Sequence, residues 1–158
     1  MNKVLISIVL YQTELQDSLT YQSFIQHKNT CSFEFDLLII NNSPETLIKE
    51  NADYIVYHSK KNIKLAGAYN QALQIAKEKN INWLLLLDQD TSLNKNYFLE
   101  LNSFFSSQKH KEYTVAIPYV FSKEKQVSPL KYHPLLGPFA GLKEIKGNTD
   151  KHICLSAF

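Results

Sequence analysis

The chain has 158 residues, of which 44% are hydrophobic and 20% charged, and its formal net charge is +2 at pH 7. This size and composition are typical of one globular domain with its own core, and they exclude a disordered or fibrous chain. The small net charge and the lack of a basic stripe argue against nucleic acid as a partner. All 17 basic residues are lysine. No guanidinium can therefore clamp a phosphate, which leaves that task to a metal ion, lysines or backbone N–H groups.

The cysteines and the first apolar segment indicate the compartment. Cys31 and Cys154 are far apart and lack metal-site spacing, so we expect free thiols in a reducing compartment. The apolar segment from Val4 to Tyr11 is too short to span a membrane and has no signal-peptide cleavage pattern. We expect a cytoplasmic protein, and peripheral contact with the inner face of a membrane and a homodimer both stay open.

The first predicted elements are a strand, a turn and a helix. The β-branched run from Val4 to Leu10 predicts a buried strand. Thr13, followed three residues later by Gln16, has the form of a capping box. It predicts a helix that runs to about His27 and buries Leu19.

The next elements alternate in the same way. A second strand is predicted at Phe35–Ile40, and it stops at the turn formers Asn41–Pro44. A short helix is then expected from Pro44 to Glu50, followed by a third strand at Tyr54–Tyr57. Apolar and small residues at helical spacing predict a longer helix from Leu65 to Lys79.

The remaining signals weaken toward the end of the chain. Trp83–Leu87 is an apolar run that suits a strand buried on both faces. Asn94 is expected to cap a helix at Lys95–Ser106, and Val115–Tyr119 predicts a fifth strand. Residues 126–158 contain three of the four glycines and show no periodicity, so we expect loops and a short hairpin there.

Strands that alternate with helices predict a mostly parallel sheet with right-handed crossovers. In such sheets ligands bind beyond the carboxyl ends of the strands. The polar stretches Tyr11–Thr13, Asn41–Ser43 and Asp88–Ser92 each follow a predicted strand. We therefore expect these three stretches to lie together on one edge of the sheet.

Two carboxylates, Asp88 and Asp90, end the apolar run. In extended backbone, alternate side chains share a face, so these two would point to one side and Gln89 away from it. Two carboxylates form a hard oxygen pair suited to Mg²⁺ or Mn²⁺ carrying phosphates. The alternative is that they are only turn and capping residues after a strand.

Four blocks in a fixed order carry a family resemblance over about Val4 to Tyr119. The chain resembles the nucleotide-binding half of a family 2 glycosyltransferase, and its LDQDT form is similar to the rhamnosyltransferase-like branch. The blocks are SIVLY at Ser7–Tyr11, LLIINNS at Leu37–Ser43, NIKLAGAYNQAL at Asn62–Leu73 and LLLLDQDT at Leu84–Thr91.

The resemblance implies a fold and partners. The implied fold is the α/β glycosyltransferase A (Rossmann-like) fold, with a mostly parallel central sheet flanked by helices and an incomplete C-terminus. Residues 1–119 would form the nucleotide-sugar-binding core, and 120–158 the loop-rich start of the acceptor half in the same domain. The implied partners are a dTDP- or UDP-sugar, a saccharide or lipid-linked acceptor, and Mn²⁺ or Mg²⁺, in surface polysaccharide synthesis.

The resemblance also implies site residues. Asn41 and Asn42 stand where the family usually has an acid, and Lys64 stands where it often has a glycine. An amide can still bind a base or ribose, as a neutral donor and acceptor. Asp90 would bind the metal, and Asp88 would contact ribose or the metal through water. The implied nucleotide-sugar-binding residues are Tyr11, Thr13, Asn41, Asn42, Asn62, Gly67, Asn70 and Asp88.

The catalytic base is not identified by the sequence. Family 2 enzymes invert configuration and use a downstream carboxylate as the base. After Glu124 only Glu144 and Asp150 are acidic, and neither lies in a recognisable acceptor motif. The chain is therefore expected to be either an enzyme fragment too short to act alone or a non-catalytic nucleotide-sugar-binding domain. A more distant alternative is a haloacid-dehalogenase-like phosphatase with an aspartate nucleophile, although that family expects Thr or Val at the position of Ser92.

Overall fold

The computed structural model describes residues 3–107, 111, 116, 118–128, 130–131 and 143–144. The chain divides into two compact units, Met1–Glu112 and Tyr113–Phe158. All the predicted site residues belong to the first unit.

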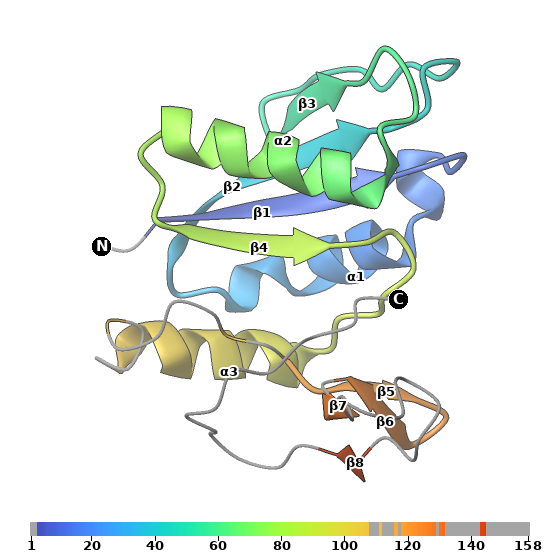
Figure 1. Ribbon diagram of the computed structural model, residues 1–158. Coiled ribbons are helices and arrows are strands. Elements are labelled where there is room, and N and C mark those ends of the chain that lie inside the picture. The colour runs from blue at the N-terminus through green and yellow to red at the C-terminus, as the bar shows by residue number, and fades with distance from the viewer. Residues whose placement is uncertain are drawn as a thin grey trace. The chain divides into compact units, whose positions relative to one another are not determined.

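A four-stranded parallel sheet forms the centre of the first unit (Figure 1). Its strands are β1 (Lys3–Leu10), β2 (Glu34–Asn41), β3 (Ile55–His58) and β4 (Trp83–Leu87). The order across the sheet is β3-β2-β1-β4, so the chain adds strands on one side of β1 and then crosses to the other. The first four predicted strands are confirmed, and so is the α/β class.

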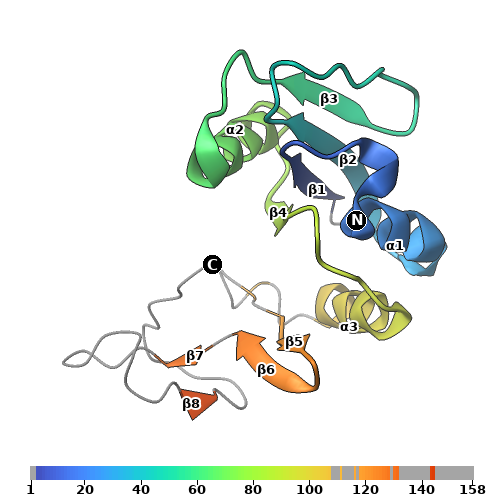
Figure 2. The ribbon, with the colours of Figure 1, turned by 90° about the vertical axis from the view of Figure 1, so that its right-hand side faces the viewer.

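Helices cover both faces of this sheet. Helix α1 (Leu19–His27) follows the short 3₁₀ helix η1 (Leu15–Asp17) and precedes a second one, η2 (Lys28–Thr30). Helix α2 (Lys64–Glu78) lies on one face, and α1 and α3 (Lys95–Ser106) lie on the other (Figure 2).

Alternation along β1 supplies both halves of the core. Ile6 and Ile8 belong to the cluster that contains Phe24 of α1 and Phe98 of α3. Leu5 and Val9 point to the other face, because successive side chains of a strand alternate. There they meet the small residues of α2, which let that helix approach the sheet closely: Ala68, Ala72 and Ala76.

The predicted start of the first helix is wrong. Thr13 does not cap it; Ser18 does, and its Oγ accepts a hydrogen bond from the Tyr21 N–H at 3.2 Å. The intervening 3₁₀ turn shifts the phase of the helix. Leu19 consequently faces solvent, with 52% of its surface exposed, instead of the core.

The predicted helix at Pro44–Glu50 does not form. The N–H of Thr46 donates to the Ser43 carbonyl at 3.1 Å, which closes a turn. Asn41 uses its side-chain oxygen for the Ser43 N–H at 3.0 Å. A local bond of this kind offers the backbone an alternative to a helix.

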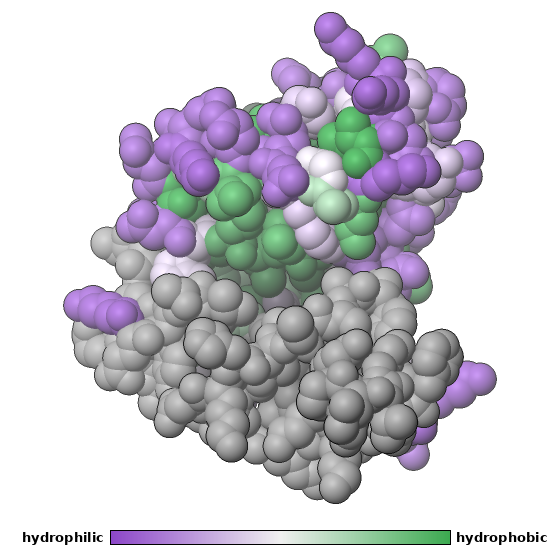
Figure 3. Space-filling model, viewed as in Figure 1, coloured by the Kyte–Doolittle hydropathy of each residue, from purple (hydrophilic) through white to green (hydrophobic). Residues whose placement is uncertain are grey.

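The apolar strand β4 is less covered than its sequence indicates. Only Leu87 is buried, and Leu86 has 38% of its surface exposed. Among the described residues, β4 pairs with β1 alone, so one of its edges has no neighbouring strand. Figure 3 shows apolar side chains gathered over β4 and the adjoining side of α2, whose outer surface is hydrophilic.

Two predicted helix boundaries are confirmed. Asn94 caps α3, and its Oδ1 accepts from the Tyr97 N–H at 2.9 Å. Helix α2 ends before Asn80, which adopts a left-handed φ of 54°. The N–H of Ile81 then reaches back to the Ala76 carbonyl at 2.9 Å, as in a Schellman end.

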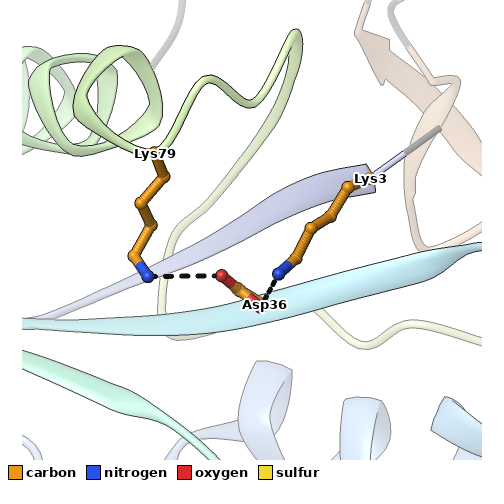
Figure 4. A network of polar contacts seen from close by, with 3 residues as sticks. All are labelled: Lys3, Asp36 and Lys79. Carbon is orange, nitrogen blue, oxygen red and sulfur yellow. Dashed lines mark ion pairs between the residues drawn. The ribbon is translucent and has the colours of Figure 1, made fainter.

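An ion-pair network lies at the amino ends of β1 and β2, away from the carboxyl edge (Figure 4). Asp36 of β2 binds Lys3 of β1 at 2.7 Å and Lys79, just past α2, at 3.4 Å. Burial raises the pKa of Asp36, but the two lysines outweigh burial and the net pKa is lowered.

The second unit contains short antiparallel pairs. Strands β5 (Val120–Ser122) and β6 (Lys125–Ser128) form a hairpin, and β7 (Leu130–Lys131) pairs with β8 (Lys143–Glu144). The two turn residues of the β5–β6 hairpin, Lys123 and Glu124, both have positive φ, as hairpin turns favour. The antiparallel pair β7–β8 lies within residues 126–158, where a short hairpin was expected, whereas the hairpin β5–β6 begins before that range. Of the strand predicted at 115–119, Val115 and Ile117 lie outside the described residues, and Ala116, Pro118 and Tyr119 are not in a strand, so the prediction is wrong at these three positions.

Candidate functional site

The carboxyl ends of the four strands meet at one edge of the sheet. Leu10 pairs with Asn41, and Asn41 with His58, at the last registered positions of their strands. Strand β4 ends on the other side of β1 at Leu87, opposite Ile8. The loops after β1, β2 and β4 therefore begin side by side, as parallel pairing dictates.

Hydrogen bonds join these three loops directly. The Tyr11 N–H donates to Oε1 of Gln89 at 2.7 Å, and the Gln12 N–H donates to Oγ of Ser43 at 2.6 Å. Gln12 adopts a left-handed φ of 52° in this turn. The prediction that the polar stretches after β1, β2 and β4 lie together is confirmed.

We call residues 88–93, which follow β4, the acid loop. Extended backbone ends at Leu87 and the chain bends at Gln89 and Asp90, so strand alternation does not set the directions of the two carboxylates. Asp88 is half-buried and its Oδ1 accepts from Oγ1 of Thr91 at 2.6 Å, whereas Asp90 is exposed. The side chain of Gln89 does not point away from the site, because it binds the loop after β1.

Tyr69 of α2 lies close enough to Asp88 to be affected by its charge. Burial raises the pKa of the Tyr69 phenol, and the negative charge of Asp88 raises it further. Tyr69 was not among the predicted site residues. The structure adds it to the surroundings of the acid loop.

Asn41 uses all its polar atoms within the protein. Its Oδ1 accepts from the Ser43 N–H and the Thr46 hydroxyl, and its Nδ2 donates to the Thr46 carbonyl at 2.9 Å. Nδ2 also lies 3.3 Å from Nδ1 of His58, whose Nε2 is 3.1 Å from the Ile48 carbonyl. Because a carbonyl only accepts, Nε2 carries the imidazole proton and Nδ1 is the acceptor. Asn41, which is buried, therefore shapes the loop after β2.

Asn42 connects the loop after β2 to the start of α2. Its Nδ2 donates to Oδ1 of Asn62 at 3.1 Å, and its Oδ1 accepts from the Ile63 N–H at 2.9 Å. Asn62 Oδ1 also accepts from the N–H of Lys64 at 2.8 Å. Lys64 has a φ of 62°, a left-handed conformation that costs a non-glycine residue energy. These contacts bring together Asn42 and Asn62, both of which the sequence predicts as site residues.

The other predicted residues are less directly connected. Thr13 is half-buried and its hydroxyl donates to the Tyr11 carbonyl at 3.2 Å. Gly67 packs against Ile63, because a Cβ at residue 67 would stand 2.9 Å from the Ile63 Cβ. Asn70 is exposed on α2. The backbone of Gly67 thus serves local packing at the start of that helix.

The carboxylates could hold a hard metal ion only with other ligands. Among residues 3–107 and the other described positions, no group of three His, Cys, Asp or Glu side chains is placed to bind a metal. Asp88 and Asp90 alone suit Mg²⁺ or Mn²⁺, which commonly keep several waters and take substrate phosphates as ligands. The oxygen donors fit such an ion.

Cys31 is a free thiol, and burial raises its pKa to about 11. A thiol with a raised pKa is a poor nucleophile and metal ligand. Cys154 lies outside the described residues. In the part of the chain that the structure describes, no helix is both long and apolar enough to cross a membrane.

The family model for glycosyl transferase family 2 matches residues 20–157, which include the loops after β2 and β4 and all of α2. A comparison with curated proteins and one with solved structures found no significant match.

Proposed function

The chain belongs to glycosyl transferase family 2, and from this premise we propose that the carboxyl edge of its sheet binds the nucleotide-diphosphate part of a sugar donor. Family membership makes the chain a glycosyltransferase with an α/β fold of the glycosyltransferase A type. The observation that supports the location is the pair of hydrogen bonds from Tyr11 and Gln12 to the loops after β4 and β2. Ligands of parallel sheets bind at this edge.

We assign the loop after β1 to the nucleobase. Tyr11 has 40% of its surface exposed while its backbone is anchored to Gln89. An exposed aromatic ring on an anchored backbone offers a base a surface on which to stack. Thr13 lies beside it, since its hydroxyl binds the Tyr11 carbonyl.

The asparagine residues have two kinds of role in this proposal. Asn41 shapes the loop, because its polar atoms already have partners. Asn42 and Asn62 hold the start of α2 beside the donor, where Gly67 and Asn70 follow. The donor is a UDP- or dTDP-sugar.

Asp90, with Asp88, would hold a Mn²⁺ or Mg²⁺ ion. Bound there, the ion would supply Lewis-acid stabilisation of the diphosphate leaving group. Asp90 is exposed and available to a ligand, while Thr91 fixes one oxygen of Asp88. Family 2 chemistry inverts the sugar in a single displacement, and we assign no residue of this chain as the base that deprotonates the acceptor.

The finer details rest on the sequence blocks. We propose the rhamnosyltransferase-like branch from LDQDT, with a saccharide or lipid-linked acceptor in polysaccharide synthesis at the cytoplasmic face of the membrane. The phosphatase alternative is not retained, because the aspartates follow the fourth strand of the chain instead of the first. A non-catalytic donor-binding domain is the alternative that experiment must separate.

Thermal unfolding with UDP or dTDP, with and without Mn²⁺, tests the proposal. Binding to the native state raises the midpoint in a concentration-dependent way. We expect the protein to be stabilised only when nucleotide and Mn²⁺ are both present. Asp90→Ala should lose this stabilisation. The control Asp53→Ala should keep it, because Asp53 is an exposed aspartate in the loop before β3. Stabilisation by the nucleotide that is the same without Mn²⁺ and in Asp90→Ala would contradict the metal assignment. Release of UDP or dTDP from a sugar donor by this chain alone would exclude the non-catalytic alternative.

A further inference from the structure

Three buried hydroxyls of the α1 segment face the acid loop. They lie on Ser18, Thr20 and Ser23, none of which the sequence indicated as site residues. A helix whose buried face carries hydroxyls instead of apolar groups must give each of them a partner. Those partners are main-chain groups at alternate residues of the acid loop: Gln89, Thr91 and Leu93.

Thr20 binds both polar groups of one residue. Its Oγ1 donates to the Thr91 carbonyl at 2.9 Å and accepts from the Thr91 N–H at 3.0 Å. Thr20 is fully buried, so water cannot replace these bonds. A side chain that pairs with both the N–H and the C=O of Thr91 fixes the orientation of that peptide segment, as a neighbouring strand would.

Thr91 in turn holds the carboxylate of Asp88. Its hydroxyl donates to Oδ1 of Asp88 at 2.6 Å, a short bond to a charged acceptor. Such bonds are roughly twice as strong as those between neutral groups. One oxygen of Asp88 is therefore held by Thr91, which leaves the other to face a ligand.

We propose that Thr20 is a positioning residue of the donor site, and that it sets the direction of the Asp88 carboxylate through Thr91. This inference rests on the proposed function, because the carboxylate needs a set direction only if it binds a metal ion or ribose. Groups that orient metal-binding carboxylates affect affinity although they do not touch the ion.

Ser23 provides a matched control on the same helix. It is buried like Thr20, and its hydroxyl accepts from the Leu93 N–H at 3.0 Å. Leu93 is apolar and points its side chain into the core. Loss of the Ser23 hydroxyl should therefore reduce stability without turning Asp88.

The test is the affinity for Mn²⁺ at saturating UDP, measured by titration calorimetry. Thr20→Val keeps the shape of the side chain but removes its hydroxyl, and we expect Mn²⁺ to bind about tenfold to a hundredfold more weakly. Thr20→Ser should restore the affinity. Ser23→Ala should lose thermal stability yet bind Mn²⁺ as the wild type does.

A double-mutant cycle isolates the connection through Thr91. Thr91→Val retains the backbone bonds to Thr20 and removes the bond to Asp88, so it tests the same link with less risk to folding. We expect it to weaken Mn²⁺ binding as Thr20→Val does, and adding Thr20→Val to it should weaken binding no further. Additive losses, or normal Mn²⁺ affinity in Thr91→Val, would overturn the inference.

The wild type separates this inference from the proposed function. If wild-type protein with UDP binds no Mn²⁺, the proposed donor site itself is overturned. If the wild type binds Mn²⁺ and Thr20→Val binds it equally well, only the role of Thr20 is overturned.

Discussion

The side-chain carbonyl of Gln89 accepts a hydrogen bond from the Tyr11 N–H at 2.7 Å. Gln89 stands between Asp88 and Asp90, so this bond joins the residue at the centre of the acid pair to the first residue after β1. The same residue is held from α1, because its main-chain carbonyl accepts from the Ser18 hydroxyl at 2.9 Å. Gln89 thus couples the segment assigned to the base with the one assigned to the diphosphate.

Replacing Gln89 by Met should uncouple these two segments. Met has a similar length but cannot accept the Tyr11 N–H, so we expect stability to fall by about 1 kcal/mol and the dissociation constant for UDP with Mn²⁺ to rise several-fold. Chemical denaturation and calorimetry measure the two effects. Gln74→Met is the control, because Gln74 is exposed and its side chain bonds Glu78 on its own helix. Unchanged UDP affinity in Gln89→Met would show that the two loops bind independently.

The regular elements of the first unit could be predicted because their signals are local. The β-branched run of β1 and the helical spacing of α2 each fall within a single segment, and both elements formed within about a residue of the expected bounds. Asn94 caps α3 as predicted, since its partner is only three residues away.

The contacts that shape the site could not be predicted in this way. The bond from Thr20 to Thr91 joins residues 71 positions apart, and the one from Gln89 to Tyr11 joins residues 78 apart. Whether such groups meet depends on how α1 packs against the end of β4, which no local pattern encodes. The predicted cap at Thr13 failed for a related reason, because a 3₁₀ turn intervenes and leaves capping to Ser18.

The charge of Asp88 should be detectable through Tyr69. Burial and Asp88 raise the pKa of Tyr69. The neutral phenol therefore stabilises the native state at pH values below the ordinary tyrosine pKa of about 10. That contribution is lost as the pH rises through the raised native pKa. Asp88→Asn should lower the pKa of Tyr69 toward its ordinary value without reaching it, since burial remains.

Ultraviolet titration of the phenolates measures this shift, and Tyr69→Phe in each background assigns the signal to Tyr69. Asp90→Asn is the control, because Asp90 is not among the groups that shift the pKa of Tyr69. Identical Tyr69 titrations in wild type and Asp88→Asn would mean that the two side chains are not close.

Gly67→Ala should destabilise the protein although alanine favours helices. In an ordinary helix interior this change would stabilise by about 1 kcal/mol. Here the new Cβ would stand 2.9 Å from the Cβ of Ile63, an atom fixed to the backbone. Ile63 would have to move, which strains its N–H bond to Asn42.

Chemical denaturation decides between the two effects. Ala66→Gly, at an exposed position one residue earlier, should cost only the intrinsic difference of about 1 kcal/mol. We expect Gly67→Ala to lower both stability and UDP affinity, because Asn42 and Asn62 lie beside the proposed donor. A Gly67→Ala protein more stable than wild type would contradict the close contact with Ile63.

Asp36 should make stability depend on acid pH and on salt. Its pKa is lowered from 3.8, because Lys3 and Lys79 outweigh the opposing effect of burial. A lowered pKa means that the ionised group stabilises the native state above the unfolded value, and that this stabilisation is lost as the pH falls through the lowered native pKa. Partly exposed ion pairs of this kind contribute about 1 kcal/mol or less, and salt screens them.

Asp36→Asn should therefore reduce the free energy of unfolding at pH 7 and low salt, and the difference from wild type should shrink in high salt and at pH values below 3.8. Asp53→Asn, at an exposed loop position, should show no such difference in the free energy of unfolding. If Asp36→Asn lowered that free energy equally at all pH values, the loss would come from packing and not from charge.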